Sequence, residues 1–180
     1  MILDALLQFS GTQNLAQVAG SYVSTNIIDL HILAPPGTPV LANNQGARDL
    51  GIGDDPALKL LVQVITTFTS GGGATLAVAL QGATDNGSGS PNAFSTWWTS
   101  PTYALGTLVA GARLLDMDMP RPPAGIAIPR FLQLNYTIGS ATTTAGTVSA
   151  FIVIDRHDQP YFTTNNAVLS GYPPGIVIAN

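Results

Sequence analysis

Hydrophobic and polar residues alternate along several stretches of the chain, which is the pattern of β-strands with one face in a core. In residues 58–68, leucine, valine and phenylalanine alternate with Lys59, Gln63 and Thr67. The strands predicted in this way are 22–32, 58–68, 76–80, 103–109, 112–119, 130–139 and 147–155. The pattern therefore indicates about eight strands, and we find no internal repeat.

Segments rich in glycine and proline separate these strands. TSGGGAT, residues 69–75, lies between two of them and predicts a hairpin connection. Residues 34–57 hold four prolines and four glycines, which predicts a long irregular loop. Loops of this length are usually functional or docked on a partner. TDNGSGSPN, residues 84–92, predicts a second and flexible loop.

The two ends of the chain differ from its middle. Residues 1–21 suit a short helix or an extended arm equally, because they carry Gly11 and Gly20 and little charge, and we adopt the arm as the working assignment. Residues 159–180 have no charged side chain. Such a segment readily pairs with an exposed strand edge, so we expect it to dock on its own domain or a neighbour. We predict one domain, 1–180, with arm 1–21, core 22–155 and tail 156–180.

Charged residues make up only 9% of the chain, against about 25% in ordinary soluble domains. Glutamate is absent, and β- and turn-forming residues are abundant, which predicts an all-β protein. No apolar run approaches the ~18 residues that a membrane helix needs. A surface with so few ions is suited to burial against neighbouring subunits.

Charge and cysteine content exclude several partners and chemistries. The net charge is −4 and the arginines are scattered, which argues against a nucleic-acid partner. Without cysteine there is no disulfide, thiol nucleophile or cysteine-bound metal. The first residues, MILDALLQFSG, lack the basic region of a signal peptide, so synthesis in the cytoplasm without export is expected.

Two acidic loops are candidate cation or phosphate sites. In ARDLGIGDDP, residues 47–56, the charges of Asp54 and Asp55 would repel a phosphate. Together with Asp49 they could hold a cation, but the spacing of a calcium loop is absent, and turn residues are the preferred interpretation. DNGSG at 85–89 is a weaker calcium candidate, for which a loop is preferred.

Three further groups could carry chemistry. Arg156, His157 and Asp158 stand together, but neighbours in an extended chain point to alternate sides, and a strand end is preferred. Asp116 and Asp118 share one face of a strand and could form a glycosidase pair, although a polar strand face is preferred.

Trp97 and Trp98, which follow a polar loop, could stack on sugars or anchor a core or subunit interface. The sequence thus predicts no catalytic, cofactor-binding or metal-binding residue, no cofactor, and a protein that is not an enzyme.

Three segments carry a family resemblance: NIIDL (26–30), RDLGIGDDPALKLLVQV (48–64) and RFLQLNYTIGSATTTAGTVSAFI (130–152). With the first residues, MILDA, they resemble the capsid cement, or decoration, proteins of short-tailed bacteriophages, over about residues 22–155. The sequence departs from the family pattern at about residues 84–105 and from residue 159 onward. Whether this member makes an additional contact with the shell through these segments is left open by the sequence.

The resemblance implies a jelly-roll β-sandwich that forms a homotrimer on the capsid exterior and bridges neighbouring major capsid proteins, with no cofactor. The protein would be a virion component made in the host bacterial cytoplasm. In this setting, residues 47–56 would serve as the structural entry to the next strand. The alternative is a carbohydrate-binding β-sandwich module for host-surface glycans that uses Trp97 and Trp98.

Overall fold

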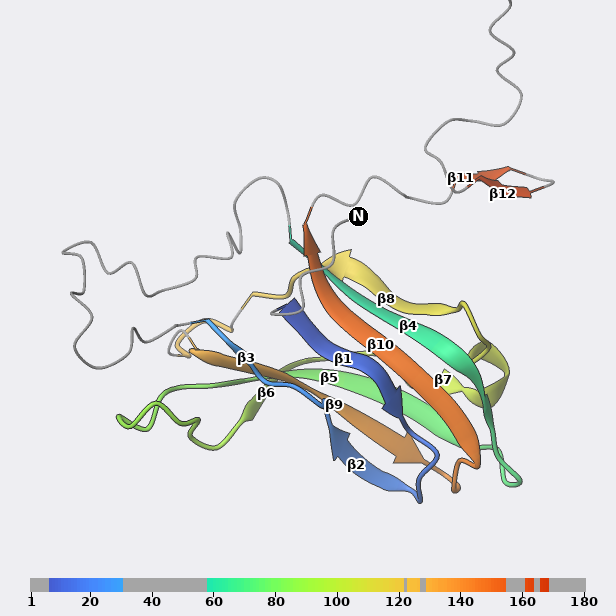
Figure 1. Cartoon of the computed structure of the whole chain (residues 1–180), viewed down its shortest axis with the longest axis horizontal. Coiled ribbons are helices and arrows are strands. Elements are labelled where there is room, and N and C mark those ends of the chain that lie inside the picture. The colour runs from blue at the N-terminus through green and yellow to red at the C-terminus, as the bar shows by residue number, and fades with distance from the viewer. Residues whose placement is uncertain are drawn as a thin grey trace, which may run out of the picture.

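Two antiparallel β-sheets pack face to face around the hydrophobic core (Figure 1). The computed structural model describes residues 7–30, 58–121, 123–126, 129–154, 161–163 and 166–168. Within these ranges the chain forms strands, turns and short 3₁₀ segments, and no α-helix. The same part of the chain holds no helix of the length and apolarity needed to cross a bilayer. The prediction of an all-β protein is confirmed.

The strands divide into a four-stranded sheet, a six-stranded sheet and a separate hairpin. The four-stranded sheet has the order β1 (Gln8–Asn14), β10 (Ala145–Ile154), β4 (Leu58–Thr69) and β8 (Arg113–Asp118). The six-stranded sheet has the order β2 (Gly20–Val23), β9 (Phe131–Gly139), β5 (Thr75–Ala83) and β6 (Ser95–Thr99), with β3 (Ile28–Asp29) beside β9 and β7 (Tyr103–Ala104) beside β5. The hairpin pairs β11 (Tyr161–Thr163) with β12 (Asn166–Val168).

The strand order is that of a jelly roll. Apart from the two-residue strands β3 and β7, the chain places β1, β4, β8 and β10 in one sheet and β2, β5, β6 and β9 in the other. Each sheet therefore contains strands from both halves of the sequence, so neither half completes a sheet alone. Eight main strands in two such sheets are the architecture of jelly rolls, and the expected fold is confirmed.

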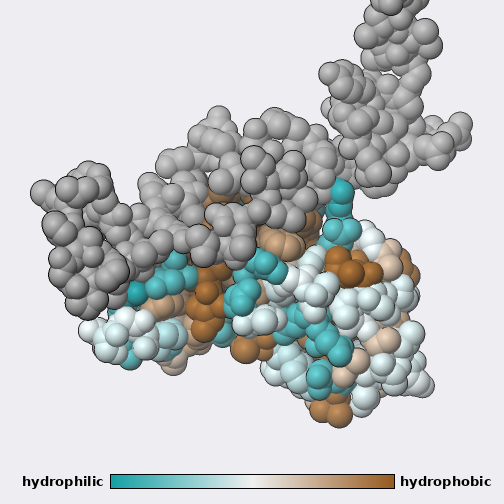
Figure 2. Space-filling view, in the orientation of Figure 1, coloured by the Kyte–Doolittle hydropathy of each residue, from teal (hydrophilic) through white to brown (hydrophobic). Residues whose placement is uncertain are grey.

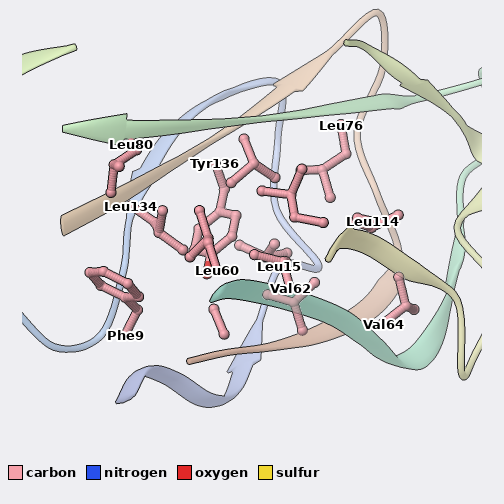
Figure 3. Close-up of a cluster of buried hydrophobic side chains, with 14 of the residues drawn as sticks. Phe9, Leu15, Leu60, Val62, Val64, Leu76, Leu80, Leu114, Leu134 and Tyr136 are labelled. Atoms are coloured by element: carbon pink, nitrogen blue, oxygen red, sulfur yellow. The ribbon is translucent and has the colours of Figure 1, made fainter. Parts of the chain in front are cut away.

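Alternating hydrophobic residues supply the inner faces of both sheets. Leu60 and Val62 on β4 and Leu134 and Tyr136 on β9 have no exposed surface. Figure 3 shows these side chains converging between the sheets, together with Phe9 from β1. Burying an aliphatic side chain of this size contributes about 1.5–3 kcal/mol relative to leaving it in water. The period-two pattern in the sequence thus marks the sides that form the core.

The segment TSGGGAT is not a hairpin connection, contrary to the sequence prediction. β4 lies in the four-stranded sheet and pairs with β10, whereas β5 lies in the six-stranded sheet and pairs with β9. Residues 70–74 therefore carry the chain from one sheet to the other. An alternating pattern tells which face of a strand is buried, but it does not identify the strand beside it.

Two of the predicted strands are shorter than expected. From Tyr103 the strand β7 covers only two residues, and Leu105–Thr107 form a 3₁₀ turn. Between β2 and β3, the hydroxyl of Ser24 donates to the carbonyl oxygen of Asn26 at 2.8 Å. This local bond turns the backbone out of the strand, so the segment that begins at Tyr22 is interrupted. Residues 31–32 lie outside the described residues.

The predicted N-terminal arm is wrong for the part of it that the structure describes. Residues 8–14 form β1, which pairs with β10 in the four-stranded sheet, and residues 20–23 form β2 in the other sheet. Phe9 and Leu15 have no exposed surface, so their burial holds this segment in the sandwich. In the predicted tail, β11 and β12 pair with each other, and the expected docking of the tail stays a prediction.

Candidate functional site

The two ends of the jelly roll differ in the connections that they carry. At one end, which we call the short-turn end, five-residue connections at 15–19, 70–74 and 140–144 join the two sheets, and so does the longer connection 100–112, which contains β7. At the opposite end, which we call the loop end, β3 finishes and β4 begins, and the connections from β5 to β6 and from β8 to β9 start and finish there. The start of β1 and the finish of β10 also lie at the loop end, because Gln8 pairs with Phe151. The longest connection, residues 30–57, therefore begins and finishes at the loop end, where β3 ends and β4 begins (Figure 1).

An arginine at the loop end joins three separate parts of the chain. Arg130, just before β9, donates through Nε and Nη2 to the two carboxylate oxygens of Asp29, each at 2.9 Å. Its Nη1 donates to Oδ2 of Asp85, in the connection that follows β5. The guanidinium carbon also lies 4.7 Å from the ring centroid of Phe131. This paired geometry gives the arginine one orientation, which a lysine could not reproduce.

Asp85 and Arg130 in this cluster both have shifted pKa values. Burial raises the pKa of Asp85, but hydrogen bonds from the backbone N–H groups of Gly89 and Gly87 and from Arg130 outweigh it and hold the pKa below its ordinary value. The hydrogen bond to Asp29 raises the pKa of Arg130, against a smaller opposing effect of burial. Asp85 and Arg130 are therefore both ionised at neutral pH.

The loop at residues 84–92, which was expected to be flexible, is held by its own side chains. Oδ1 of Asp85 accepts from the backbone N–H groups of Gly87 at 2.8 Å and Gly89 at 3.0 Å. Nδ2 of Asn92 donates to the carbonyl oxygen of Asp85 and to the hydroxyl of Thr84, each at 3.0 Å. Gly87 and Gly89 have φ values of 90° and 84°, which favour glycine.

These contacts weigh against the calcium site considered at residues 85–89. The carboxylate of Asp85 accepts bonds from two backbone N–H groups at Oδ1 and from the Arg130 guanidinium at Oδ2, so both oxygens already have donors. The described residues contain no group of three aspartate, glutamate, histidine or cysteine side chains that could hold a metal. The preferred interpretation, a loop, is thereby supported.

The candidate carboxylate pair on β8 forms two separate ion pairs. Asp118 lies 3.1 Å from Nζ of Lys59, on the neighbouring strand β4. Asp116 lies 3.7 Å from Nη1 of Arg113. Each carboxylate therefore has its own cation at the surface, an arrangement that contributes little to stability. The geometry favours the polar strand face over a glycosidase pair.

The two tryptophans on β6 both turn toward the core. An irregularity in the pairing of β5 and β6 places Trp98 opposite Leu80 and lets Trp97 lie against Gly82, where a Cβ atom would overlap its indole ring. Both side chains are partly buried and pack against the hydrophobic core. Nε1 of Trp97 is buried as well, so it does not point to solvent. This packing favours their interpretation as core anchors over a sugar-stacking platform.

Several candidates from the sequence lie outside the described residues. These are Arg48 to Gly53, Asp54 and Asp55, the rest of the long loop 34–57, and the group Arg156, His157 and Asp158. Sequence reasoning in turn missed the cluster around Arg130. Its partners Asp29 and Asp85 lie 101 and 45 positions away along the chain, so no local pattern connects them.

On its two central strands, β5 and β9, the outer face of the six-stranded sheet carries polar groups without ionised side chains, whereas Asp29 on β3 lies on the same face beside Phe131. On β5 and β9 the residues that alternate with the core residues are Thr75, Ala77, Ala79, Gln81, Gln133, Asn135 and Thr137. Gln133 donates from Nε2 to Oε1 of Gln81 at 2.7 Å, and Gln81 donates to the hydroxyl of Thr96 at 3.1 Å. A row of uncharged hydrogen bonds thus crosses three strands of this face.

Hydrophobic residues do not gather in one patch on the part of the surface that Figure 2 leaves uncovered. In Figure 2 they occur in separate groups among polar and neutral residues. The exposed large hydrophobic residues of the described chain are Val18, Val23, Ile27, Ile65, Val109 and Ile126. The low charge of the sequence is therefore accommodated mainly by amide, hydroxyl and small side chains.

Comparison with known proteins identifies a family. Residues 9–152 match the family model described as Bbp16, a stretch that runs from β1 into β10 and covers most of the chain. The chain therefore belongs to the Bbp16 family. A comparison with curated protein sequences finds no match.

Proposed function

We propose that this member of the Bbp16 family is a structural virion protein that cements a bacteriophage capsid. In this proposal the protein sits on the outer capsid surface, forms a homotrimer and bridges neighbouring major capsid proteins. It is made in the host bacterial cytoplasm and has no enzymatic role. The sequence resemblance to cement proteins suggests this function, and the jelly-roll fold is compatible with it.

The observation that carries the proposal is the uncharged outer face of β5 and β9, the two central strands of the six-stranded sheet. Covering a charged surface removes water from ions, which is costly, whereas amides and hydroxyls can exchange water for hydrogen bonds with a partner. The face around Ala77, Ala79 and Asn135 presents such groups on a regular sheet. A surface of this kind suits a protein whose flanks are covered by other subunits.

The mechanism is multivalent attachment. Packed genome pushes capsid subunits apart, so a cement protein must add contacts across the joints between them. Each contact of one subunit can be weak, because a trimer that is held at one point presents its other contacts at high effective concentration. The gain in avidity from such linkage is about 10² to 10⁴.

The test uses the purified full chain and phage capsids that lack it. We expect the protein to sediment with the capsids, to add density to their outer surface, and to raise the temperature at which they open. Mass measurement in solution is expected to give a trimer. Capsids that gain neither density nor stability would contradict the proposal. A protein that is monomeric in solution and binds the capsid as independent single subunits would contradict the multivalent mechanism.

A further inference from the structure

We infer that the loop at residues 84–92 is a preformed contact element through which the loop end of the jelly roll docks on an uncharged, hydrogen-bonding surface of a capsid protein. This inference rests on the proposed function and adds to it the part of the molecule that faces the shell. It is carried by the Arg130 cluster and by the order and the uncharged exposed groups of the loop itself.

The loop is ordered before any partner binds. Asp85 is fixed from one side by Arg130 and from the other by the backbone N–H groups of Gly87 and Gly89. Asn86 closes the tip, because its Oδ1 accepts from the backbone N–H and the hydroxyl of Ser88 at 2.9 and 2.7 Å. A loop that is already held in one conformation loses less entropy when it binds, so more of its contact energy becomes affinity.

The groups that the loop presents define the chemistry of the partner. Asn86, Ser88, Ser90 and Asn92 are exposed and uncharged. The one acidic side chain of the loop, Asp85, is paired with Arg130 and directed at the domain. What the loop offers outward is therefore amide, hydroxyl and backbone groups, which match a protein surface with similar groups rather than a charged polymer or an ion.

The position of the loop distinguishes this end from the other. Three connections at the short-turn end are five residues long, and the longer one, 100–112, packs back onto β5 through β7. At the loop end, Arg130 ties the 84–92 connection to Asp29, the last residue of β3, and its backbone N–H donates to Ala83 on β5 at 3.0 Å. The clamp thus fixes the loop to the frame of the six-stranded sheet, so force applied at the loop is transmitted to several strands.

The inference is tested with a bulky charge placed at each end of the full chain. Ser90→Arg adds an arginine to the loop, and Thr142→Arg adds the same side chain to an exposed turn at the short-turn end. Neither side chain makes a hydrogen bond in the described structure. We expect S90R to weaken binding to capsids that lack the protein by about tenfold or more, as is usual for a charge buried at an interface, and T142R to bind within about twofold of wild type.

One further variant, compared with S90R, separates loop order from loop chemistry. Arg130→Lys keeps the charge but cannot hold Asp29 and Asp85 with paired bonds, so we expect weaker capsid binding even where thermal unfolding shows a folded domain. S90R should unfold at nearly the wild-type temperature, which shows that its loss of binding is not a loss of fold.

The outcomes are distinguishable from a failure of the proposed function. Wild-type protein that does not bind capsids overturns the cement proposal itself. Two results would leave the cement function standing but overturn the docking of the loop end, provided that the wild-type protein binds. In one, T142R loses affinity and S90R keeps it. In the other, both variants lose affinity equally.

Discussion

The phenolic oxygen of Tyr136 lies 2.9 Å from the hydroxyl oxygen of Ser10, in the buried space between the two sheets. The Ser10 hydroxyl also donates to Oε1 of Gln13 at 2.7 Å, and Gln13 donates from Nε2 to the carbonyl oxygen of Val23 at 2.7 Å. This network connects β9 of one sheet with β1 of the other. It shows how the start of the chain is held in the domain by polar groups as well as by the burial of Phe9.

Replacing Tyr136 by phenylalanine is expected to lower the free energy of unfolding by about 1–2 kcal/mol, because a buried hydrogen bond is lost while the ring remains. Urea unfolding followed by fluorescence measures the change. Ser10→Ala serves as the partner in a double-mutant cycle, in which the two losses should not add. Additive losses would mean that the two hydroxyls do not depend on each other.

Stability should also fall at alkaline pH because of Tyr136. Burial raises the pKa of this tyrosine well above its ordinary value, and the hydrogen bond to Ser10 offsets only part of the effect. As the pH rises, Tyr136 therefore loses its phenolic proton in the unfolded chain before it does so in the folded one. The stability that protonated Tyr136 contributes is complete below about pH 10 and is lost as the pH rises further. Wild type should lose more stability between pH 9 and 11 than Y136F. Parallel curves for the two proteins would contradict this.

At acidic pH the Arg130 cluster should weaken. The pKa of Asp85 is held below its ordinary value, so the unfolded chain takes up this proton at a higher pH than the folded one. The stability that ionised Asp85 contributes is present above about pH 4 and is lost as the pH falls through the pKa of Asp85 in the folded protein. Asp85→Asn should therefore flatten the decline of the unfolding temperature between pH 5 and 2. An unchanged decline would show that Asp85 is not linked to folding.

Gly82 and Gly71 provide a matched pair of glycine substitutions. A methyl group at Gly82 would overlap the indole of Trp97, so Gly82→Ala is expected to destabilise the domain by about 1–3 kcal/mol through overpacking. Gly71 has open space and no positive φ, so Gly71→Ala should stabilise by about 0.4–1 kcal/mol by restricting the unfolded chain. Thermal unfolding measures both, and equal effects of the two changes would contradict the packing of Trp97.

Attachment to capsids should change little with salt. The outer face of β5 and β9 and the exposed part of loop 84–92 present uncharged groups, whose contacts are not screened by ions. We expect the bound fraction to be nearly constant from low to near-molar sodium chloride. Release of the protein over this range would mean that ion pairs hold it to the shell.

The sequence by itself determined the class of fold and the composition of the core. On β4 and β9 the residues of the alternating pattern are buried in the core, because a strand turns every second residue to the same side, and Leu61, Phe131 and Gln133 are buried on the other face as well. The scarcity of charge likewise predicted surfaces built from amides and hydroxyls, as on the outer face that carries Gln81 and Gln133.

Only the tertiary structure decided which strands are neighbours and which polar groups meet. The pattern around TSGGGAT is the same for a hairpin and for a crossing between sheets, since pairing depends on strands distant in the sequence. The burial of Trp97 depends on an irregularity in the register of β6. Arg130, Asp29 and Asp85 come together because three separate strand ends meet at the loop end, a proximity that distance along the chain cannot encode.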